Sequence, residues 1–286
     1  MPNATEITAH EPHRFFTYGD MGAGKTAQIL TLPRPTFAYI FDPNALLTLR
    51  GHDIEYEQFL PIDLSLDVVS LKKGDGGLHK RGPQVMKGKV TTYEAWERDF
   101  ATRDFSKYNS IAIDSATTFL DLIMDYVLQI NGRPGQWPEQ DDYGPQMVTF
   151  TNAIRTFASL GKTLLCTGHY EVWQDRKTQR TTRQLMMTGR LRTKIPLLFS
   201  DVFYCEGGMT DDNKPQYTVQ TVKDKEIPAA RCSFTGLSPL EDVTIDFTQD
   251  LESQGLGALL AWEQAQLKPT KPAPAKGPTR TADKRK

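Results

Sequence analysis

The sequence predicts an α/β fold in which helices flank a mainly parallel central sheet. Apolar runs with strand character alternate with helical segments along the 286 residues, an order that is typical of parallel sheets covered on both faces. Most of these runs are apolar throughout, as expected for strands buried on both sides. A glycine-rich turn joins the first strand to the first helix. These three observations favour one large α/β domain.

Strands and helices alternate from the start of the predicted domain. Residues 14–18 form a strand that leads through the glycine-rich turn into a short helix at 25–32, which Pro33 ends. A second buried strand is predicted at 36–41, because this run is almost continuously apolar. Residues 64–71 form a third apolar stretch with strand character. These elements begin the sheet.

The next segment changes character before the alternation resumes. Glycine and basic residues dominate 72–90, and we expect a flexible, basic surface insertion there. A helix follows at 92–100, with Thr92 as its N-cap. A strand at 110–114 ends in a carboxylate and leads into an amphipathic helix at 117–129. A carboxylate therefore lies between a buried strand and a helix.

The second half of the chain continues the same alternation. Glycine and proline interrupt residues 131–145, which predicts a loop before a helix at 147–160. Residues 171–190 are polar and basic, and we interpret them as a second loop. The remaining predicted strands are 163–167, 202–205 and 217–222.

The composition indicates an ordinary globular protein of the cytoplasm. Hydrophobic residues make up 38% of the chain and charged residues 24%, so the chain can bury a full core and still carry a charged surface. No apolar run approaches the roughly 18 residues that cross a bilayer, and the first residues lack the apolar core of a signal peptide. We therefore expect no membrane partner.

Charge and composition change toward the C-terminal end. Residues 268–286 hold seven basic residues against one acidic residue, and they contain too few apolar residues to fill a core. We therefore divide the chain into an N-terminal segment at 1–13, a folded domain at 14–262 and a disordered basic tail at 263–286. Two interpretations of the tail stay open: it attracts DNA through its charge, or it only increases solubility.

The glycine-rich turn carries a phosphate-binding motif, the P-loop, at residues 19–26. It follows the pattern G-x-x-x-x-G-K-[ST], in which backbone N–H groups and a helix N-terminus point at phosphate oxygens. Lys25 would reach the β and γ phosphates, and the Thr26 hydroxyl would hold Mg²⁺. The predicted nucleotide-binding residues are Gly19, Asp20, Met21, Gly22, Ala23, Gly24, Lys25, Thr26 and Ala27.

A carboxylate at the end of a buried strand supplies the second part of the site. Asp114 closes the strand at 110–114, where it can accept the hydration shell of Mg²⁺ beside the P-loop. The alternative is an N-cap of the following helix. Because Asp114 follows a P-loop after several alternating elements, we favour the metal role and assign Thr26 and Asp114 as metal ligands.

Hydrolysis needs a group that orients or deprotonates the attacking water. Asp42 follows the strand at 36–41 and is the best-placed candidate, although Asp-Pro pairs are also common turn formers. His169 follows the strand at 163–167, where a sensor of the γ-phosphate would lie. Its alternative role is a histidine with satisfied hydrogen bonds at a strand end. Both interpretations stay open for each residue.

These residues resemble the RecA-like P-loop ATPases, and most closely the phage-encoded, AAA-type nucleotide-binding proteins of the Sak single-strand annealing group. Several landmarks carry the resemblance, and together they cover about residues 14–234. The landmarks are GDMGAGKT, TFAYIFD, SIAIDSATTF, TLLCTGHYE and TVKDKEIPAA. The resemblance implies a RecA-like fold, with ATP and Mg²⁺ as cofactors.

The resemblance also implies partners. In RecA, two lysines one residue apart reach the ATP of the neighbouring subunit; Lys223 and Lys225 would take this role, which implies a homo-oligomer. The loops after the metal-binding strand's helix and after the sensor strand touch single-stranded DNA in the family, and here they are residues 131–145 and 171–190. The second loop is basic and offers Trp173 for stacking on a base, whereas the first is acidic.

Two departures from the family pattern concern hydrolysis. RecA-like recombinases usually carry a glutamate after the second strand, where this chain has Asp42, and His169 replaces the usual sensor glutamine. We predict an ATP-binding, DNA-stimulated ATPase that binds single-stranded DNA in phage recombination or annealing, in the host cytoplasm. The alternative is a motor, loader or nucleotide-switched regulator that acts on a protein partner in DNA replication, such as a single-strand-binding protein.

Overall fold

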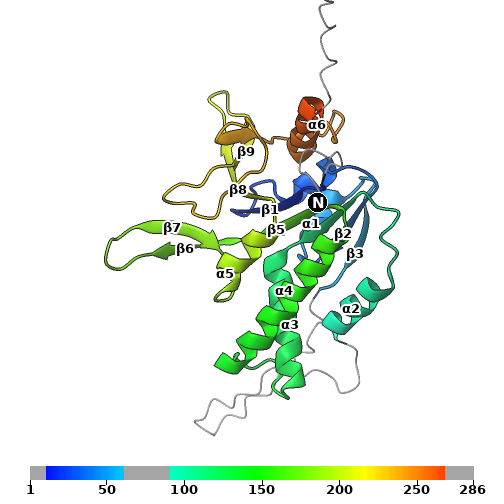
Figure 1. Ribbon diagram of the computed structural model, residues 1–286, viewed down its shortest axis with the longest axis vertical. Helices are drawn as coiled ribbons and strands as arrows, with labels where there is room; N and C mark the ends of the chain where they lie inside the picture. Colours follow the sequence, from blue (N-terminus) through cyan, green and yellow to red (C-terminus); the bar gives the residue numbers. More distant parts are fainter. Residues whose placement is uncertain (1–10, 61–90, 268–286) are drawn as a thin grey trace, which may run out of the picture.

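A mostly parallel sheet forms the centre of the computed structural model, which describes residues 11–60 and 91–267 (Figure 1). The predicted features at 64–71, 72–90 and 268–286 lie outside these residues. The sheet strands are β1 (Arg14–Gly19), β2 (Thr36–Ile40), β3 (Glu55–Gln58), β4 (Ser110–Asp114), β5 (Thr163–Gly168), β8 (Asp201–Met209), β9 (Pro215–Gln220) and β10 (Leu240–Asp242).

In space the eight strands follow the order β10-β9-β8-β1-β5-β4-β2-β3. The neighbouring strands β8, β1, β5, β4, β2 and β3 are parallel to one another, and β9 and β10 add two antiparallel strands at the β8 edge. The mainly parallel sheet that the sequence predicts is therefore confirmed. The strand β5 lies between β1 and β4, so the P-loop strand and the Asp114 strand are not direct neighbours.

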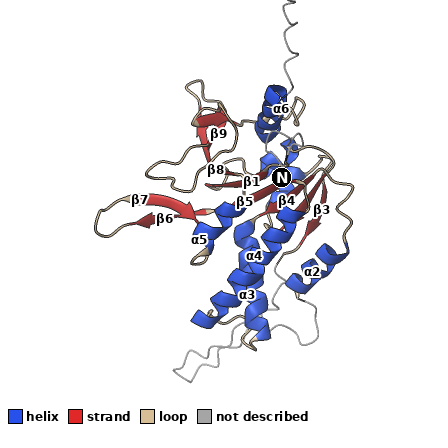
Figure 2. Ribbon diagram, viewed as in Figure 1, coloured by secondary structure: helices blue, strands red, loops and turns tan. Residues whose placement is uncertain are grey.

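Helices cover both faces of the sheet (Figure 2). Successive strand residues point to opposite faces, so Phe16 and Phe37 pack toward α2, α3 and α4 in one core, while Phe15 and Ala38 pack toward η2, α1 and α6 in the other. The helical elements are η2 (Thr26–Thr31), α1 (Ala45–Leu49), α2 (Thr92–Thr102), α3 (Ala116–Ile130), η3 (Gln140–Asp142), α4 (Tyr143–Ser159), α5 (Leu191–Lys194), η4 (Ile195–Leu198) and α6 (Gly255–Leu267).

Two predicted helix starts are corrected by the structure, and one helix extends past the predicted domain end. The N-cap of α2 is Thr91, whose hydroxyl accepts the Glu94 N–H at 3.0 Å in a capping box, and not Thr92. Helix α4 begins at Tyr143 instead of residue 147, because a proline is tolerated in the first turn of a helix. Helix α6 runs to Leu267, past the predicted domain end at 262.

The prediction of a loop at 171–190 was wrong, because most of this segment forms an antiparallel hairpin of β6 (Tyr170–Gln174) and β7 (Thr181–Leu185). Figure 1 shows the hairpin projecting from the body of the molecule. Only one residue of its two strands is buried, so the strands lack the apolar alternation that identifies a half-buried strand. The edge strand β3 was missed for the same reason.

A buried histidine ties α6 to the sheet and makes stability depend on pH. His13 Nδ1 lies 2.8 Å from Asp201 Oδ2, and its Nε2 lies 2.7 Å from Glu263 Oε2. Burial lowers the pKa of His13, but the hydrogen bonds to both carboxylates outweigh burial and raise this pKa above the usual value. The contribution of His13 is therefore fully present below the unfolded-state pKa of about 6.5 and is lost as the pH rises through the folded-state pKa.

We expect the free energy of unfolding to fall between pH 6 and pH 9, and we expect His13→Gln to flatten this dependence. The variant should also lose about 3 kcal/mol at pH 6, because it removes the cation that lies between the Asp201 and Glu263 carboxylates. Urea unfolding followed by circular dichroism at several pH values measures both effects. An equal pH dependence in the variant would contradict this role of His13.

Within the part of the chain that the structure describes, no helix is both long enough and apolar enough to cross a membrane.

Candidate functional site

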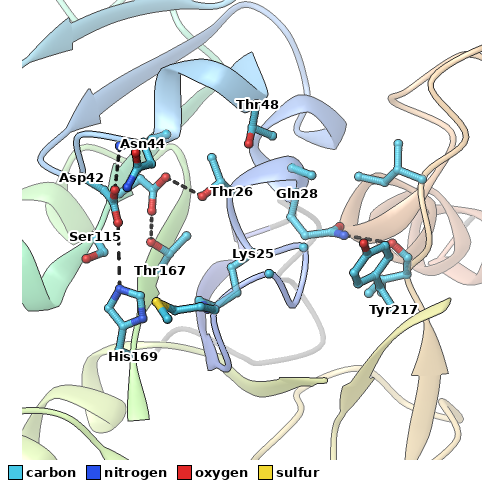
Figure 3. A pocket seen from close by; sticks show the side chains of 18 of the residues that line it. Lys25, Thr26, Gln28, Asp42, Asn44, Thr48, Ser115, Thr167, His169 and Tyr217 are labelled. Carbon is cyan, nitrogen blue, oxygen red and sulfur yellow. Dashed lines mark hydrogen bonds and ion pairs between the residues drawn. The ribbon is translucent and has the colours of Figure 1, made fainter. Parts of the chain in front are cut away.

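A pocket of about 450 Å³ opens at the edge of the sheet where the parallel strands end. Parallel pairing brings distant segments to this edge, since Tyr18 pairs with Gly168 and Ile40 pairs with Asp114. The P-loop forms one wall (Figure 3). Six of the nine predicted nucleotide-binding residues line the pocket: Met21, Gly22, Gly24, Lys25, Thr26 and Ala27.

The P-loop needs glycine at two positions for different reasons. At Gly19 an added Cβ would lie 2.0 Å from the carbonyl oxygen of Cys205 in the adjacent strand β8, so no other side chain fits. Gly24 has a φ of 75°, in the left-handed region that residues with a Cβ rarely adopt. Asp20 and Ala23, like Gly19, shape the loop without lining the pocket.

Lys25 is almost fully buried and points along the P-loop. Its Nζ donates to the carbonyl oxygens of Gly19, at 3.0 Å, and Asp20, at 2.5 Å. Burial lowers the pKa of the Lys25 ammonium below its usual value, and the nearby Asp114 and Asp42 carboxylates oppose this shift. The buried ammonium suits a triphosphate, whose oxygens would accept charge-assisted hydrogen bonds from it.

Asp114 is the centre of a hydroxyl-rich cluster behind Lys25. Its Oδ2 accepts the Thr26 hydroxyl at 2.8 Å, and its Oδ1 accepts the Thr167 hydroxyl (Figure 3). The carboxyl is buried, and burial raises its pKa while both hydroxyl groups oppose the shift. The sequence analysis missed Thr167. Its signal was a hydroxyl at the end of the strand that lies between the P-loop strand and the Asp114 strand.

Thr26 and Asp114 fit a magnesium ion. Mg²⁺ usually takes one or two carboxylates from a protein and completes its octahedron with waters and substrate phosphates. The 2.8 Å contact between the two side chains brings a hydroxyl and a carboxylate oxygen to one point of the pocket. Among residues 11–60 and 91–267, no group of three or more His, Cys, Asp and Glu side chains could hold a metal ion.

Asp42 and His169 meet on the other side of the pocket from the P-loop wall. His169 Nε2 lies 4.0 Å from Asp42 Oδ2, and both side chains line the pocket. Burial lowers the pKa of His169, the charge of Lys25 lowers it further, and Asp42 opposes both effects. Asp42 also accepts the Asn44 N–H at 2.9 Å, as an Asx turn does. Asp42 therefore lines the pocket and also forms a turn, and the catalytic roles of Asp42 and His169 stay predictions.

Lys223 and Lys225 do not reach the pocket of their own chain. Both are exposed after β9, and Lys223 lines a separate hollow of about 410 Å³. The backbone carbonyl of Lys225 accepts the Arg180 guanidinium at 2.6 Å, which joins this segment to the hairpin. The structure therefore separates the two lysines from the Lys25 site within one chain.

The hairpin is anchored beside the P-loop and exposes its far end. The Tyr170 hydroxyl donates to Asp20 Oδ1 at 2.8 Å, which places the first hairpin residue against the P-loop. Beyond this anchor, Val172 is 62% exposed and Trp173 46% exposed. Arg176 and Lys177 are exposed near the tip. A rigid base and an exposed aromatic and basic end suit the binding of an extended anionic partner.

The nucleotide pocket also has an apolar lining, which was not predicted from the sequence. Tyr217 of β9 forms part of this lining together with a segment that follows β10. Only tertiary structure brings these residues to the P-loop, because no motif marks them in the sequence. The residues of that segment that line the pocket are Val243, Ile245 and Phe247.

The chain matches one protein family over most of its length. This family is described as an AAA domain, and the match covers residues 11–231. No curated protein sequence matches the chain. Among solved structures, the flagellar accessory protein FlaH from Methanocaldococcus jannaschii is similar, with 14% identity and a TM-score of 0.37 over 82% of this chain and 87% of that chain.

Proposed function

Because the chain belongs to the AAA domain family, we propose that it is a RecA-like P-loop ATPase that hydrolyses ATP with Mg²⁺ and couples this reaction to single-stranded DNA. One observation carries the ATPase part of the proposal. Lys25, Thr26 and Asp114 share a pocket with Asp42 and His169, so phosphate binding, metal binding and a candidate base lie together.

Each of these side chains has a role that its position supports. Lys25 binds the β and γ phosphates and stabilises the charge that develops on them. Thr26 and Asp114 would hold Mg²⁺, which neutralises phosphate charge when bound. Asp42 orients the attacking water and accepts its proton, and His169, 4.0 Å away, keeps this carboxylate in place. The resemblance to RecA assigns Lys223 and Lys225 to the ATP of a neighbouring subunit in a homo-oligomer.

The DNA part of the proposal rests on the hairpin. Trp173 offers a stacking surface for a base, and Arg176 and Lys177 offer positive charge near the tip, a combination typical of sequence-tolerant single-strand binding. The experiment that tests the function is steady-state ATP hydrolysis with and without single-stranded DNA. Stimulation by DNA supports the proposal, and equal rates contradict its DNA part.

We expect Trp173→Ala to weaken binding of a fluorescent oligothymidylate roughly tenfold, because one base–aromatic stack is lost. Fluorescence anisotropy at a fixed salt concentration measures the affinity. Trp137→Ala is the matched control, since Trp137 is 91% exposed but lies on an acidic loop. If both variants bind DNA like the parent chain, the hairpin is not the DNA site.

The loop at 131–145, which carries Trp137, favours a second candidate function. This function is that of an ATPase that acts on a protein partner in DNA replication. Arg133 binds the buried Asp142 carboxylate at 2.6 and 2.7 Å, and the Glu139 N–H donates to the same carboxylate at 2.7 Å. These hydrogen bonds fix the conformation of the loop, while the indole of Trp137 stays exposed. Tryptophan is enriched among the residues that contribute most to binding at protein–protein interfaces. A rate of ATP hydrolysis that is the same with and without single-stranded DNA would favour this function.

A further inference from the structure

The nucleotide pocket has two chemically different ends. Lys25, Thr26 and Asp114 line the polar part of the pocket. Its apolar lining includes Tyr217, Phe247 and two aliphatic side chains that lie between them in sequence, and the Phe247 ring also contacts the ring of His52, with 5.9 Å between the ring centroids. In Figure 3 Tyr217 lies on the far side of the P-loop from Asp42 and His169. Phosphates occupy the polar end in the proposed function, so the rest of the ligand extends toward the apolar end.

The ring of Tyr217 is fixed against the P-loop. A Cβ added to Gly24 would lie 3.3 Å from the ring, and a Cβ added to Gly207 would lie 3.2 Å from it, so the ring packs on two glycine backbones. The Tyr217 N–H donates to Thr244 Oγ1 at 2.8 Å, and its carbonyl accepts the Val243 N–H at 2.8 Å. The ring is therefore positioned before any ligand binds.

Phe247 is exposed on a turn that is held by hydrogen bonds. Its side chain is 54% exposed although it lines the pocket. The neighbouring Asp246 accepts the Thr248 N–H at 2.9 Å and the Gln249 side-chain amide at 2.7 Å, and its own N–H donates to Gln254 at 2.7 Å. A half-exposed phenyl ring on such a turn can gain contact area from a flat ligand without ordering the turn.

The side-chain amide of Gln28 is already used in contacts within the protein. Gln28 lines the pocket between the two ends, but its Nε2 donates to the Val243 carbonyl at 2.9 Å and its Oε1 accepts the Leu256 N–H at 3.0 Å. Both ends of the amide are therefore used to hold the apolar wall in place. The contacts that remain for a ligand on this wall come mainly from aromatic rings and aliphatic side chains.

We infer that Tyr217 and Phe247 bind the base of the nucleotide and select purine over pyrimidine nucleoside triphosphates. A flat heterocycle stacks on aromatic faces, and the larger purine covers more of them than a pyrimidine does. Val243 and Ile245 exclude water from the edge of the base. This inference rests on the proposed nucleotide-binding function, since it concerns the same pocket.

Calorimetric titration of the full chain with ATP, UTP and inorganic tripolyphosphate, each with Mg²⁺, tests the inference. We expect ATP to bind more tightly than UTP. We expect Tyr217→Ala and Phe247→Ala each to weaken ATP binding roughly tenfold or more and to leave tripolyphosphate binding unchanged. Tyr217→Phe should retain ATP affinity, because it keeps the ring.

Phe247→Ala keeps the test valid if Tyr217→Ala fails to fold, since the Phe247 side chain is half exposed. Tyr56→Ala is its matched control, because Tyr56 is 49% exposed and does not line the pocket. Equal affinity of the parent chain for ATP and UTP would overturn the inference, as would equal losses of ATP and tripolyphosphate binding in the variants. If the parent chain binds neither ATP nor tripolyphosphate, the nucleotide function itself fails, and the purine site fails with it.

Discussion

Lys25→Ala is expected to abolish measurable ATP turnover and to weaken ATP binding about 100-fold. The Lys25 ammonium is buried beside the P-loop carbonyls, where it would form charge-assisted hydrogen bonds with the β and γ phosphates. Such bonds contribute about 1.5–3 kcal/mol each, and the charge on the γ-phosphate grows in the transition state. Phosphate-release kinetics and calorimetry measure the two effects.

Lys25→Arg is the matched control for charge. It keeps a cation but replaces a compact ammonium with a planar fork that does not fit the narrow turn, so we expect turnover to remain very low. Circular dichroism and thermal unfolding must show a folded variant in both cases. Turnover close to that of the parent chain in Lys25→Ala would remove the P-loop from the mechanism.

Asp42→Asn is expected to lower kcat roughly 100- to 1,000-fold and to leave the affinity for ATP nearly unchanged. The amide keeps the shape of the side chain and can still cap the turn to Asn44, whose N–H lies 2.9 Å from Asp42 Oδ1. It cannot accept a proton from water, and general-base catalysis is worth about 10²–10⁴-fold in rate. Single-turnover hydrolysis separates this step from binding.

A second variant distinguishes the base from its neighbour. His169→Gln removes the imidazole that lies 4.0 Å from Asp42 and introduces an uncharged amide in its place. We expect this variant to keep most of its turnover if Asp42 is the base. If Asp42→Asn hydrolyses ATP at the parental rate, Asp42 is only a turn former before Pro43, the alternative that the sequence left open.

Much of the fold followed from local patterns. The strands at 14–19, 36–40, 110–114 and 163–168 are continuously buried, and continuous apolar runs are the signal that strands of this kind leave in a sequence. The hairpin and the strand β3 left no such signal, because they hold only one buried residue, Leu185. Exposure therefore decided which strands could be predicted.

The site divides in the same way. The P-loop and the carboxylate Asp114 could be predicted from local sequence, because phosphate binding by a backbone turn needs glycines and a lysine at fixed spacing. The contact of Thr167 with Asp114, the approach of His169 to Asp42 and the place of Tyr217 in the pocket became visible in the folded chain. These contacts join residues far apart in the chain. They depend on strand order and register, which no local spacing encodes.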